Sequence, residues 1–291
     1  MLNPTALDAV LDGVDMVYHL AANPDVKFLR GDPTDKDLQQ NILCTYNVLE
    51  SMRRNGVPSL AFSSTSAIYG ICKRQPIAED QAPHPISLYG ATKLSCEAMI
   101  GAFQHLFGMN CWIFRFANVV GPKLRKCGGT VIGDFIDKLR RDPTRLQIMG
   151  NGRQAKSYLL ARECVEAMLF AVEHSPRGLH TFNVGCDDSL SVDRIAEMVE
   201  HALGLHGVAH EYTGGEGPCN SRSIAAESTG RGSLAAICST SVRSTAANSA
   251  AARSRLARSD ASAIACHRGS RRSRASSVLT RSSETSSPFT R

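Results

Sequence analysis

The chain has 291 residues, with 33 basic and 27 acidic side chains, a length that suits one large α/β domain or two smaller ones. No stretch approaches about 18 consecutive apolar residues, so a membrane-spanning helix is not expected. The N-terminal MLNPTALDAVLDG lacks the basic and apolar regions of a signal peptide. Ten cysteines without a Cys-x-x-Cys pair exclude zinc-finger and thioredoxin signatures, and they indicate a reducing, cytoplasmic environment.

The formal charge of +6 is unevenly distributed along the chain. Residues 1–216 carry 21 basic and 24 acidic side chains, a net charge of −3. Residues 217–291 carry 12 arginines and 3 acidic residues, a net charge of +9. The basic character therefore belongs to the C-terminal segment alone.

Short apolar runs alternate with amphipathic segments along the first part of the chain. Buried strands are predicted at residues 14–20, 60–62 and 111–116. A helix is predicted over 34–54, and a second follows Pro83 and Pro85 and ends at Gly108. The apolar residues expected on their inner faces are Leu38, Ile42, Leu49 and Met52, then Leu94, Met99, Phe103 and Leu106.

This alternation predicts a parallel α/β sheet, with a further helix at 191–204 and a strand at 209–216. Ligands in such sheets bind beyond the carboxyl ends of the strands. The segments 19–22, 63–66 and 116–118 lie at those ends, and the candidate site is expected there.

The stretch SLYGATKLSCE places Tyr89 and Lys93 four residues apart, on one face of a helix near its start. A nearby ammonium lowers the pKa of a phenol. Moving that pKa from about 10 to about 7 requires roughly 4 kcal/mol, more than one partly hydrated lysine supplies. A second cation, such as an oxidised nicotinamide ring, would be needed. Taken alone, the spacing is more often a chance pair on a solvated face.

Further motifs accompany this pair in a characteristic order. They are His-Leu-Ala-Ala (19–22), Asn41, Ser-Ser-Thr-Ser-Ala-Ile-Tyr-Gly (63–70), Arg-Phe-Ala-Asn-Val-Val-Gly-Pro (115–122), Gly-Asn-Gly-Arg-Gln-x-Lys-Ser-Tyr (150–158) and Phe-Asn-Val-Gly (182–185). Over residues 1 to about 216 the chain resembles the extended short-chain dehydrogenase/reductases, the NAD-dependent epimerase/dehydratase family. Within that family it is most similar to the UDP-glucose 4-epimerases.

The resemblance implies an enzyme that holds NAD, acts on a UDP-sugar and has a Rossmann-like fold. It implies that Tyr89 is the base, that Lys93 binds the nicotinamide ribose and lowers the Tyr89 pKa, and that Thr65 hydrogen-bonds the sugar oxygen. The other residues implied to contact the cofactor are Leu20, Ala21, Ala22, Asn41, Ser63 and Phe116. The other residues implied to contact the substrate are Ser66, Asn118 and Lys156.

The same resemblance bears on the reaction. Dehydratases and decarboxylases of this family place an acidic residue just after the catalytic threonine, where this chain has Ser66 and Ala67. This favours 4-epimerisation of UDP-glucose and UDP-galactose through a transient 4-keto sugar. Another nucleotide-sugar epimerase or a 4-keto reductase is the alternative.

Each site residue also has a structural interpretation. Ser63, Ser64 and Thr65 could be strand-end hydroxyls that satisfy backbone groups, and Asn118 a turn former before Gly121. Lys156 could be a surface charge and Asn41 a solvated helix residue. His19 is expected to be a hydrogen-bonded core histidine and neither a base nor a ligand.

The sequence departs from the family at its start. The glycine-rich turn that cradles pyrophosphate is absent, together with the first strand, about 60 residues in all. The strand at 14–20 is therefore expected to form a bare, aggregation-prone sheet edge. On this view the alternative to an active enzyme is a truncated, non-catalytic chain unable to hold NAD.

Residues 217–291 contain 19 serines and one aromatic residue, a composition typical of disorder. A shifted reading frame, a basic arm for nucleic acid and true divergence are the three explanations, and the abrupt onset favours the first. No nucleic-acid or membrane partner is expected. Residues 1–120 and 153–185 are expected to form the cofactor part, and 121–152 and 186–216 the substrate part. Family members are often dimers through the helices at 36–54 and 89–107, so a homodimer is an open alternative.

Overall fold

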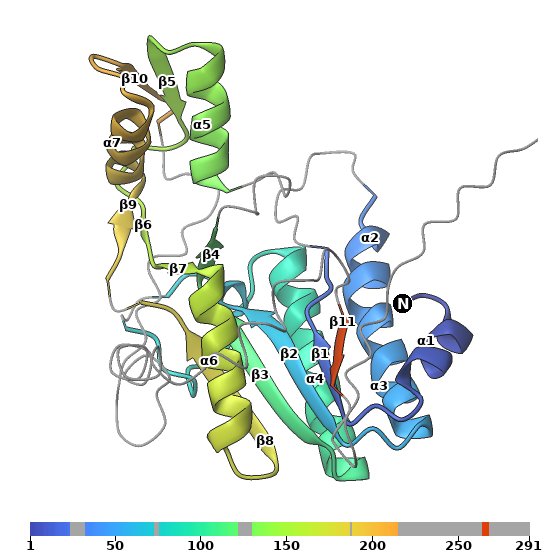
Figure 1. Ribbon diagram of the computed structural model, residues 1–291. Helices are drawn as coiled ribbons and strands as arrows, with labels where there is room; N and C mark the ends of the chain where they lie inside the picture. The colour runs from blue at the N-terminus through green and yellow to red at the C-terminus, as the bar shows by residue number, and fades with distance from the viewer. Residues whose placement is uncertain (24–32, 73–75, 122–129, 187, 215–263, 268–291) are drawn as a thin grey trace, which may run out of the picture.

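The computed structural model describes residues 1–23, 33–72, 76–121, 130–186, 188–214 and 264–267. Figure 1 shows a central sheet with helices on both faces and, at the upper left, a small lobe built from helices and short strands. None of the helices in these ranges is long and apolar enough to cross a membrane.

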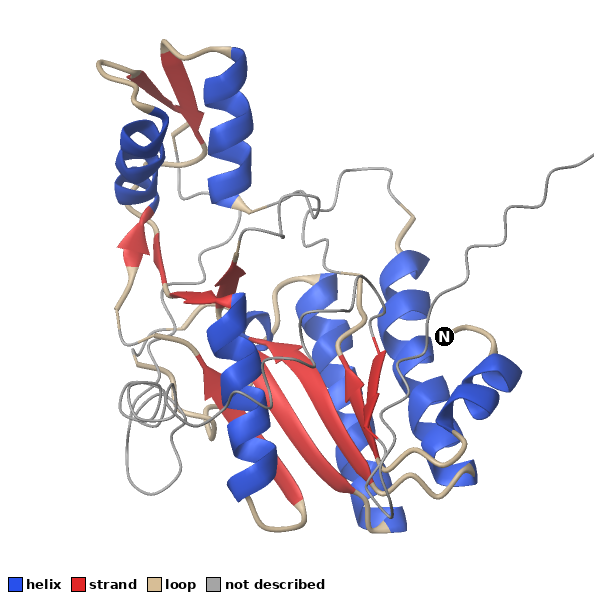
Figure 2. Cartoon of the chain, viewed as in Figure 1, coloured by secondary structure: helices blue, strands red, loops and turns tan. Residues whose placement is uncertain are grey.

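The central sheet has the strand order β11-β1-β2-β3-β8. Its parallel strands are β1 (Met16–His19), β2 (Ser59–Thr65), β3 (Asn110–Phe116) and β8 (Leu179–Val184). The strands predicted at 14–20, 60–62 and 111–116 are therefore confirmed, and so is the α/β fold class. Figure 2 shows these strands in red between the blue helices.

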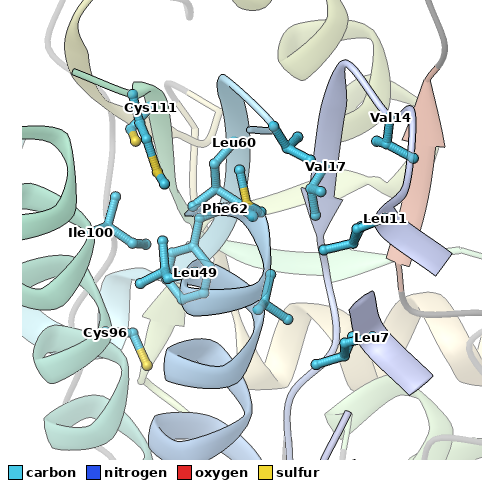
Figure 3. Packing of buried hydrophobic residues seen from close by; sticks show 14 of the residues in the cluster. Leu7, Leu11, Val14, Val17, Leu49, Leu60, Phe62, Cys96, Ile100 and Cys111 are labelled. Atoms are coloured by element: carbon cyan, nitrogen blue, oxygen red, sulfur yellow. The ribbon is translucent and has the colours of Figure 1, made fainter. Parts of the chain in front are cut away.

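Alternation along each strand sends side chains to two different cores. Figure 3 shows the first core, where Val17, Leu60, Phe62 and Cys111 meet the helices of one face. Those helices are α1 (Pro4–Leu11), α3 (Cys44–Arg54) and α4 (Leu88–Phe107). On the other face, the neighbouring residues Met16, Ala61, Trp112 and Phe114 pack with α6 (Ala161–His174).

The predicted helix over 34–54 is present but irregular. It comprises α2 (Asp35–Asp37), the π-helical turn η1 (Leu38–Leu43) and α3. A π turn inserts extra residues and rotates the helix upstream of it. For this reason Leu38 is 54% exposed, contrary to the expectation, while Leu49 and Met52 are fully buried as predicted. In α4 the left-handed cap at Gly108 is confirmed, but Leu106 is exposed and not inward-facing.

The small lobe packs α5 (Val131–Arg141) and α7 (Val192–Leu203) on the parallel pair β5 (Arg145–Ile148) and β10 (Ala209–Tyr212). Its interior consists of apolar side chains, with Phe135, Leu146 and Ile195 at its centre. The helix predicted at 191–204 and the strand predicted at 209–216 are thereby confirmed in type. Two short ladders lie between lobe and sheet: β4 (Asn118–Val120) with β7 (Tyr158–Leu160), and β6 (Ala155–Lys156) with β9 (Leu190–Ser191).

The outer edge of β1 is not bare, contrary to the expectation from the sequence. β11 (Ile264–His267) pairs antiparallel with it, from Met16 opposite His267 to His19 opposite Ile264. The basic C-terminal segment thus supplies one strand of the sheet. Its remaining residues, 217–263 and 268–291, lie outside the described residues, so the explanations offered for that segment stay predictions.

Candidate active site

The first helical turn of α4 lies against the carboxyl end of β2. Ser87 begins the helix, and its Oγ accepts a hydrogen bond from the Gly90 amide at 3.1 Å. A Cβ on Gly90 would lie 2.7 Å from the Ala67 carbonyl oxygen, so only glycine allows this close approach. Ala67 belongs to η2 (Ser66–Tyr69), the 3₁₀ turn that directly follows β2. This contact brings Tyr89 next to the end of the strand.

Consecutive residues at the end of β2 contact side chains of α4. The Ser63 carbonyl oxygen accepts a hydrogen bond from Lys93 Nζ at 2.7 Å. The Thr65 hydroxyl lies close enough to the Tyr89 phenol to lower its pKa. The structure therefore brings together the predicted base, the predicted lysine and the two predicted hydroxyl residues. Ser66, predicted to contact substrate, follows Thr65 as the first residue of η2.

Burial dominates the titration of the tyrosine. It raises the pKa of Tyr89 above its ordinary value, while the Thr65 hydrogen bond lowers it and Asp37 and Cys96 raise it further. The expectation that Lys93 makes this phenol acidic is therefore not met in the chain alone. The physical reason is that the ammonium is engaged elsewhere: it donates to Ser63 and lies 4.5 Å from the centre of the Phe62 ring.

Lys93 is itself strongly perturbed. Its side chain is fully enclosed, and this burial lowers its pKa from 10.5 to about 8. The nearby Cys96 and Glu97 act in the opposite direction and raise that pKa. Lys93 is therefore a buried amine whose pKa lies well below that of an exposed lysine.

His19 lies at the end of β1 with no solvent exposure. Its Nε2 is 3.0 Å from the Thr45 hydroxyl, and its ring is 5.5 Å from that of Phe62. Burial, together with the charge of Lys93, lowers the His19 pKa from 6.5 to about 3. The prediction of a neutral, hydrogen-bonded core histidine is confirmed.

Asn41 is a buried link between two segments and not a solvated helix residue. Its Oδ1 accepts from the Asn23 amide at 2.8 Å, and its Nδ2 donates to the Thr92 hydroxyl at 3.0 Å. Asp37 accepts from the Asn23 side chain at 2.6 Å. These bonds fix the segment after β1 against α4, and sequence reasoning did not identify Asp37 or Thr92. Helical spacing could have identified Asp37 and Thr92 in the sequence, because it places each of them near a predicted site residue.

The segment after β1 lines a hollow. Ala21 and Ala22 border a cavity of about 360 Å³ whose other lining residues are Met1, Leu2, Gln40 and Cys44. Leu20, predicted beside them, is 43% exposed. Phe116, predicted at the cofactor, packs in the second core and stacks at 6.2 Å on Phe114. Ala21 and Ala22 thus border an open cavity, whereas Phe116 is stacked among aromatic side chains of the second core.

The two predicted phosphate contacts lie toward the small lobe. Asn118 begins β4, and its Nδ2 donates to the Ser157 carbonyl at 3.0 Å. Lys156 lies in β6, opposite Leu190 of β9, and is partly exposed. Asn118 is therefore engaged with backbone, and the contact that each residue would make with a nucleotide stays a prediction.

The strand-end hydroxyls and the Tyr–Lys pair of the adjoining helix lie at the carboxyl end of a parallel sheet, where ligands bind in open α/β folds. The model of the NAD dependent epimerase/dehydratase family matches residues 1–185. The chain belongs to this family.

Similar proteins agree with this assignment. The chain is 30% identical over 205 residues to the uncharacterized UDP-glucose epimerase YtcB of Bacillus subtilis, covering 70% of this chain and 63% of that protein. It is 29% identical over 207 residues to a UDP-glucose 4-epimerase of Corynebacterium glutamicum, covering 66% and 62%. The chain thus spans less than two thirds of the length of these curated relatives.

Solved structures give the same fold. A UDP-galactose 4-epimerase superposes with a TM-score of 0.65 at 38% identity, covering 74% of this chain and 70% of that one. The UDP-glucose 4-epimerase of Thermotoga maritima, determined with UDP-glucose, gives 0.69 at 26% identity, covering 78% and 73%. The Bacillus cereus UDP-glucuronic acid 4-epimerase, determined with NAD, gives 0.68 at 26% identity, covering 80% and 76%.

Proposed function

We propose that this chain is a UDP-glucose/UDP-galactose 4-epimerase that works with NAD. One observation carries the proposal: the Tyr89 phenol lies beside the Thr65 hydroxyl, while the Lys93 ammonium donates to the Ser63 carbonyl at the same strand end. Removal of a proton from a sugar hydroxyl needs a base, a second hydroxyl that hydrogen-bonds the sugar oxygen, and a cation that stabilises the ionised base.

The described residues fit the nicotinamide side of NAD. Ala21 and Ala22 leave room along the cavity beside them, and Lys93 and Ser63 offer a donor and a hydroxyl at the neighbouring strand end. When bound, NAD accepts a hydride from the sugar and returns it. The sequence contains no glycine-rich turn after a buried strand, so this fit concerns one side of the dinucleotide.

The chain's own residues would then move one proton. Tyr89 would take it from the sugar 4-hydroxyl and give it back to the opposite epimer, with Thr65 holding the same oxygen. Because burial raises the Tyr89 pKa, the phenolate requires positive charge close by, which Lys93 and an oxidised nicotinamide ring would supply together. Asn118 and Lys156 would contact the nucleotide phosphates.

The neighbours of Thr65 support epimerisation over elimination of water. Ser66 and Ala67 follow it in η2, and neither provides the additional acid that a dehydratase needs. A related epimerase reaction is the alternative, since the relatives include a GDP-mannose 3,5-epimerase of Arabidopsis thaliana and a probable UDP-glucuronate 4-epimerase of Rhizobium meliloti. A 4-keto reductase is the other.

The test is product analysis with the purified full-length chain, UDP-glucose and NAD. Formation of UDP-galactose without net NADH consumption supports the proposal. A 4-keto-6-deoxy sugar with no UDP-galactose contradicts it, and stoichiometric consumption of NADH identifies a reductase. If borohydride treatment reveals no bound NAD and added NAD restores no turnover, the chain is the non-catalytic alternative.

We also propose a homodimer through α3 and α4. Tyr46, Leu106 and Phe107 are 45%, 67% and 48% exposed, and Phe103 joins Tyr46 to Phe107 through ring contacts. Such adjacent apolar side chains favour burial against a second copy. Sedimentation of the chain and of Leu106→Glu tests this, with the dimer lost in the variant.

The described cysteines are free, which supports the expected cytoplasmic location.

A further inference from the structure

A buried ion pair joins α4 to β3 next to the carboxyl end of β2. Glu97 of α4 and Arg115 of β3 are 7% and 8% exposed. Arg115 Nε lies 3.2 Å from both Glu97 carboxylate oxygens, and Nη2 lies 2.8 Å from Oε2. The fork therefore binds the carboxylate through two nitrogens and fixes α4 on β3.

Both partners reach further groups. Glu97 accepts a hydrogen bond from the Ser64 hydroxyl, in the strand β2. Arg115 Nη1 donates to the Tyr69 hydroxyl at 2.6 Å and to the Glu79 carbonyl at 2.9 Å. Tyr69 in turn donates to Asn183 of β8 at 2.8 Å. One network thus connects α4 with three adjacent strands at their carboxyl ends.

The network completes a regular pattern on β2. The Ser63 carbonyl accepts from Lys93, the Ser64 hydroxyl donates to Glu97 and the Thr65 hydroxyl lies beside the Tyr89 phenol, so three consecutive strand residues each contact α4. The first two contacts involve charged side chains of α4. A shift of α4 along the strand would break all three contacts together.

Stability gives no sufficient reason for charges at this place. Desolvation of a buried ion pair offsets much of its attraction, and apolar residues of similar volume are often equally stable. Charged hydrogen bonds do, however, fix geometry more narrowly than apolar packing.

We propose that the Glu97–Arg115 pair positions Tyr89 and Lys93 for proton transfer by fixing the register of α4 on the end of β2. Neither residue touches the reacting groups, so both act as positioning residues. The role in catalysis rests on the proposed epimerase function, whereas the effect on Lys93 does not.

The charge of Glu97 also acts on the lysine. The carboxylate lies one helical turn from Lys93 and raises its pKa, while burial lowers that pKa to about 8. Without the carboxylate, Lys93 should lose its proton at a lower pH. This shift measures the charge of Glu97 at Lys93, whereas kcat measures the register of α4.

The first experiment compares the full-length chain with Glu97→Gln. NMR of ¹⁵N-labelled lysine, with Lys93→Met for assignment, should place the Lys93 titration at a lower pH in the variant. With UDP-glucose and NAD, kcat should fall by about 10²-fold, the size of effect of a 1 Å misplacement, while KM changes less than about 3-fold. An unchanged Lys93 titration together with unchanged kcat would overturn the proposal.

Two further variants separate position from stability. Ile100→Ala removes a fully buried side chain from the core side of the same helix, so it should lower the free energy of unfolding. It should leave the Lys93 titration at its parental pH, and kcat should stay within about 2-fold of the parental value. If Glu97→Gln does not fold, the double variant Glu97→Leu/Arg115→Met replaces it. That variant should fold, and its kcat should still fall by about 10²-fold. Full activity in the folded double variant would contradict the positioning role.

The Lys93 titration needs no cofactor. If the parent chain shows no turnover, the proposed function fails while the titration still tests the ion pair. If the parent turns over and the variants titrate and react like it, the ion pair has no positioning role and the proposed function stands.

Discussion

The carboxyl end of the sheet and the small lobe bury different kinds of side chain. At the sheet end, His19, Lys93, Glu97 and Arg115 are all buried, together with Asn41 and Asn183. In the small lobe the described residues contribute apolar side chains to the interior, and ion pairs such as Arg194–Glu197 lie at the surface.

Burying a polar or charged group costs free energy unless a partner replaces its hydrogen bonds to water. This arrangement is therefore unfavourable wherever apolar packing alone would give a stable interior. The sheet end buries such groups where Tyr89 and Lys93 meet the strands, whereas the described core of the lobe is apolar and its His210–Glu200 pair stays partly exposed. This contrast agrees with the proposal that the chemistry takes place at the sheet end.

The largest expected effect comes from Tyr89→Phe. Removing the phenol oxygen removes the proposed base, so kcat should fall by about 10²- to 10⁴-fold. Binding of UDP-sugar, measured by calorimetry, should change little because the ring remains. A variant that keeps more than about a tenth of the parental kcat would assign the proton transfer to another group.

A second difference should appear in acid. Because burial lowers the His19 pKa to about 3, the unfolded chain binds a proton below pH 6.5 that the folded chain excludes. Stability should therefore decrease as the pH falls from 6.5 towards 3, by up to roughly 5 kcal/mol over the whole window. Urea unfolding of the parent and of His19→Gln, at several pH values, tests this. A slope of equal size in the variant would contradict it.

In the lobe, packing should dominate. Leu146 is fully buried between α5 and α7, so Leu146→Ala should destabilise by about 2–5 kcal/mol through lost apolar burial and the cavity it leaves. Hydrogen exchange should show the loss in α5, α7 and β10, and the Lys93 titration should stay at its parental value. Spread of the effect to the sheet end would show that the two regions unfold as one.

The smallest effect is expected at the lobe surface. Arg194 Nη1 lies 2.7 Å from Glu197, but the two side chains are 60% and 56% exposed. Arg194→Gln should therefore change the free energy of unfolding by less than about 0.5 kcal/mol, which thermal denaturation can bound. A loss of unfolding free energy as large as that expected for a buried pair would show that the lobe surface and the sheet end do not differ in this respect.

Periodicity and order of motifs were sufficient for the fold and for the central residues. The strands at 14–20, 60–62 and 111–116 and the helices were predictable because burial imposes a period of two or about 3.6 on the sequence. Tyr89, Lys93, Thr65 and Ser63 were predictable from spacing and resemblance together. Leu38 and Leu106 were placed on the wrong face, the first because a π turn changes the helical phase.

Contacts between distant segments were beyond the sequence. Nothing in the pattern pairs Glu97 with Arg115, since their contact depends on how α4 crosses β3. The rise of the Tyr89 pKa in the chain alone depends on burial and on where the Lys93 ammonium points, and its lowering in the presence of the cofactor stays a prediction. Spacing along one helix contains neither quantity.

The pairing of β1 with β11 has a consequence for synthesis. The two strands lie near opposite ends of the sequence, at Met16–His19 and Ile264–His267. A ribosome adds about 5–20 residues per second, so β1 emerges on the order of ten to fifty seconds before its outer partner. During that interval the edge of β1 is free to pair with the same strand of another nascent chain. Slower translation should lengthen this interval and increase the fraction of newly made protein that aggregates.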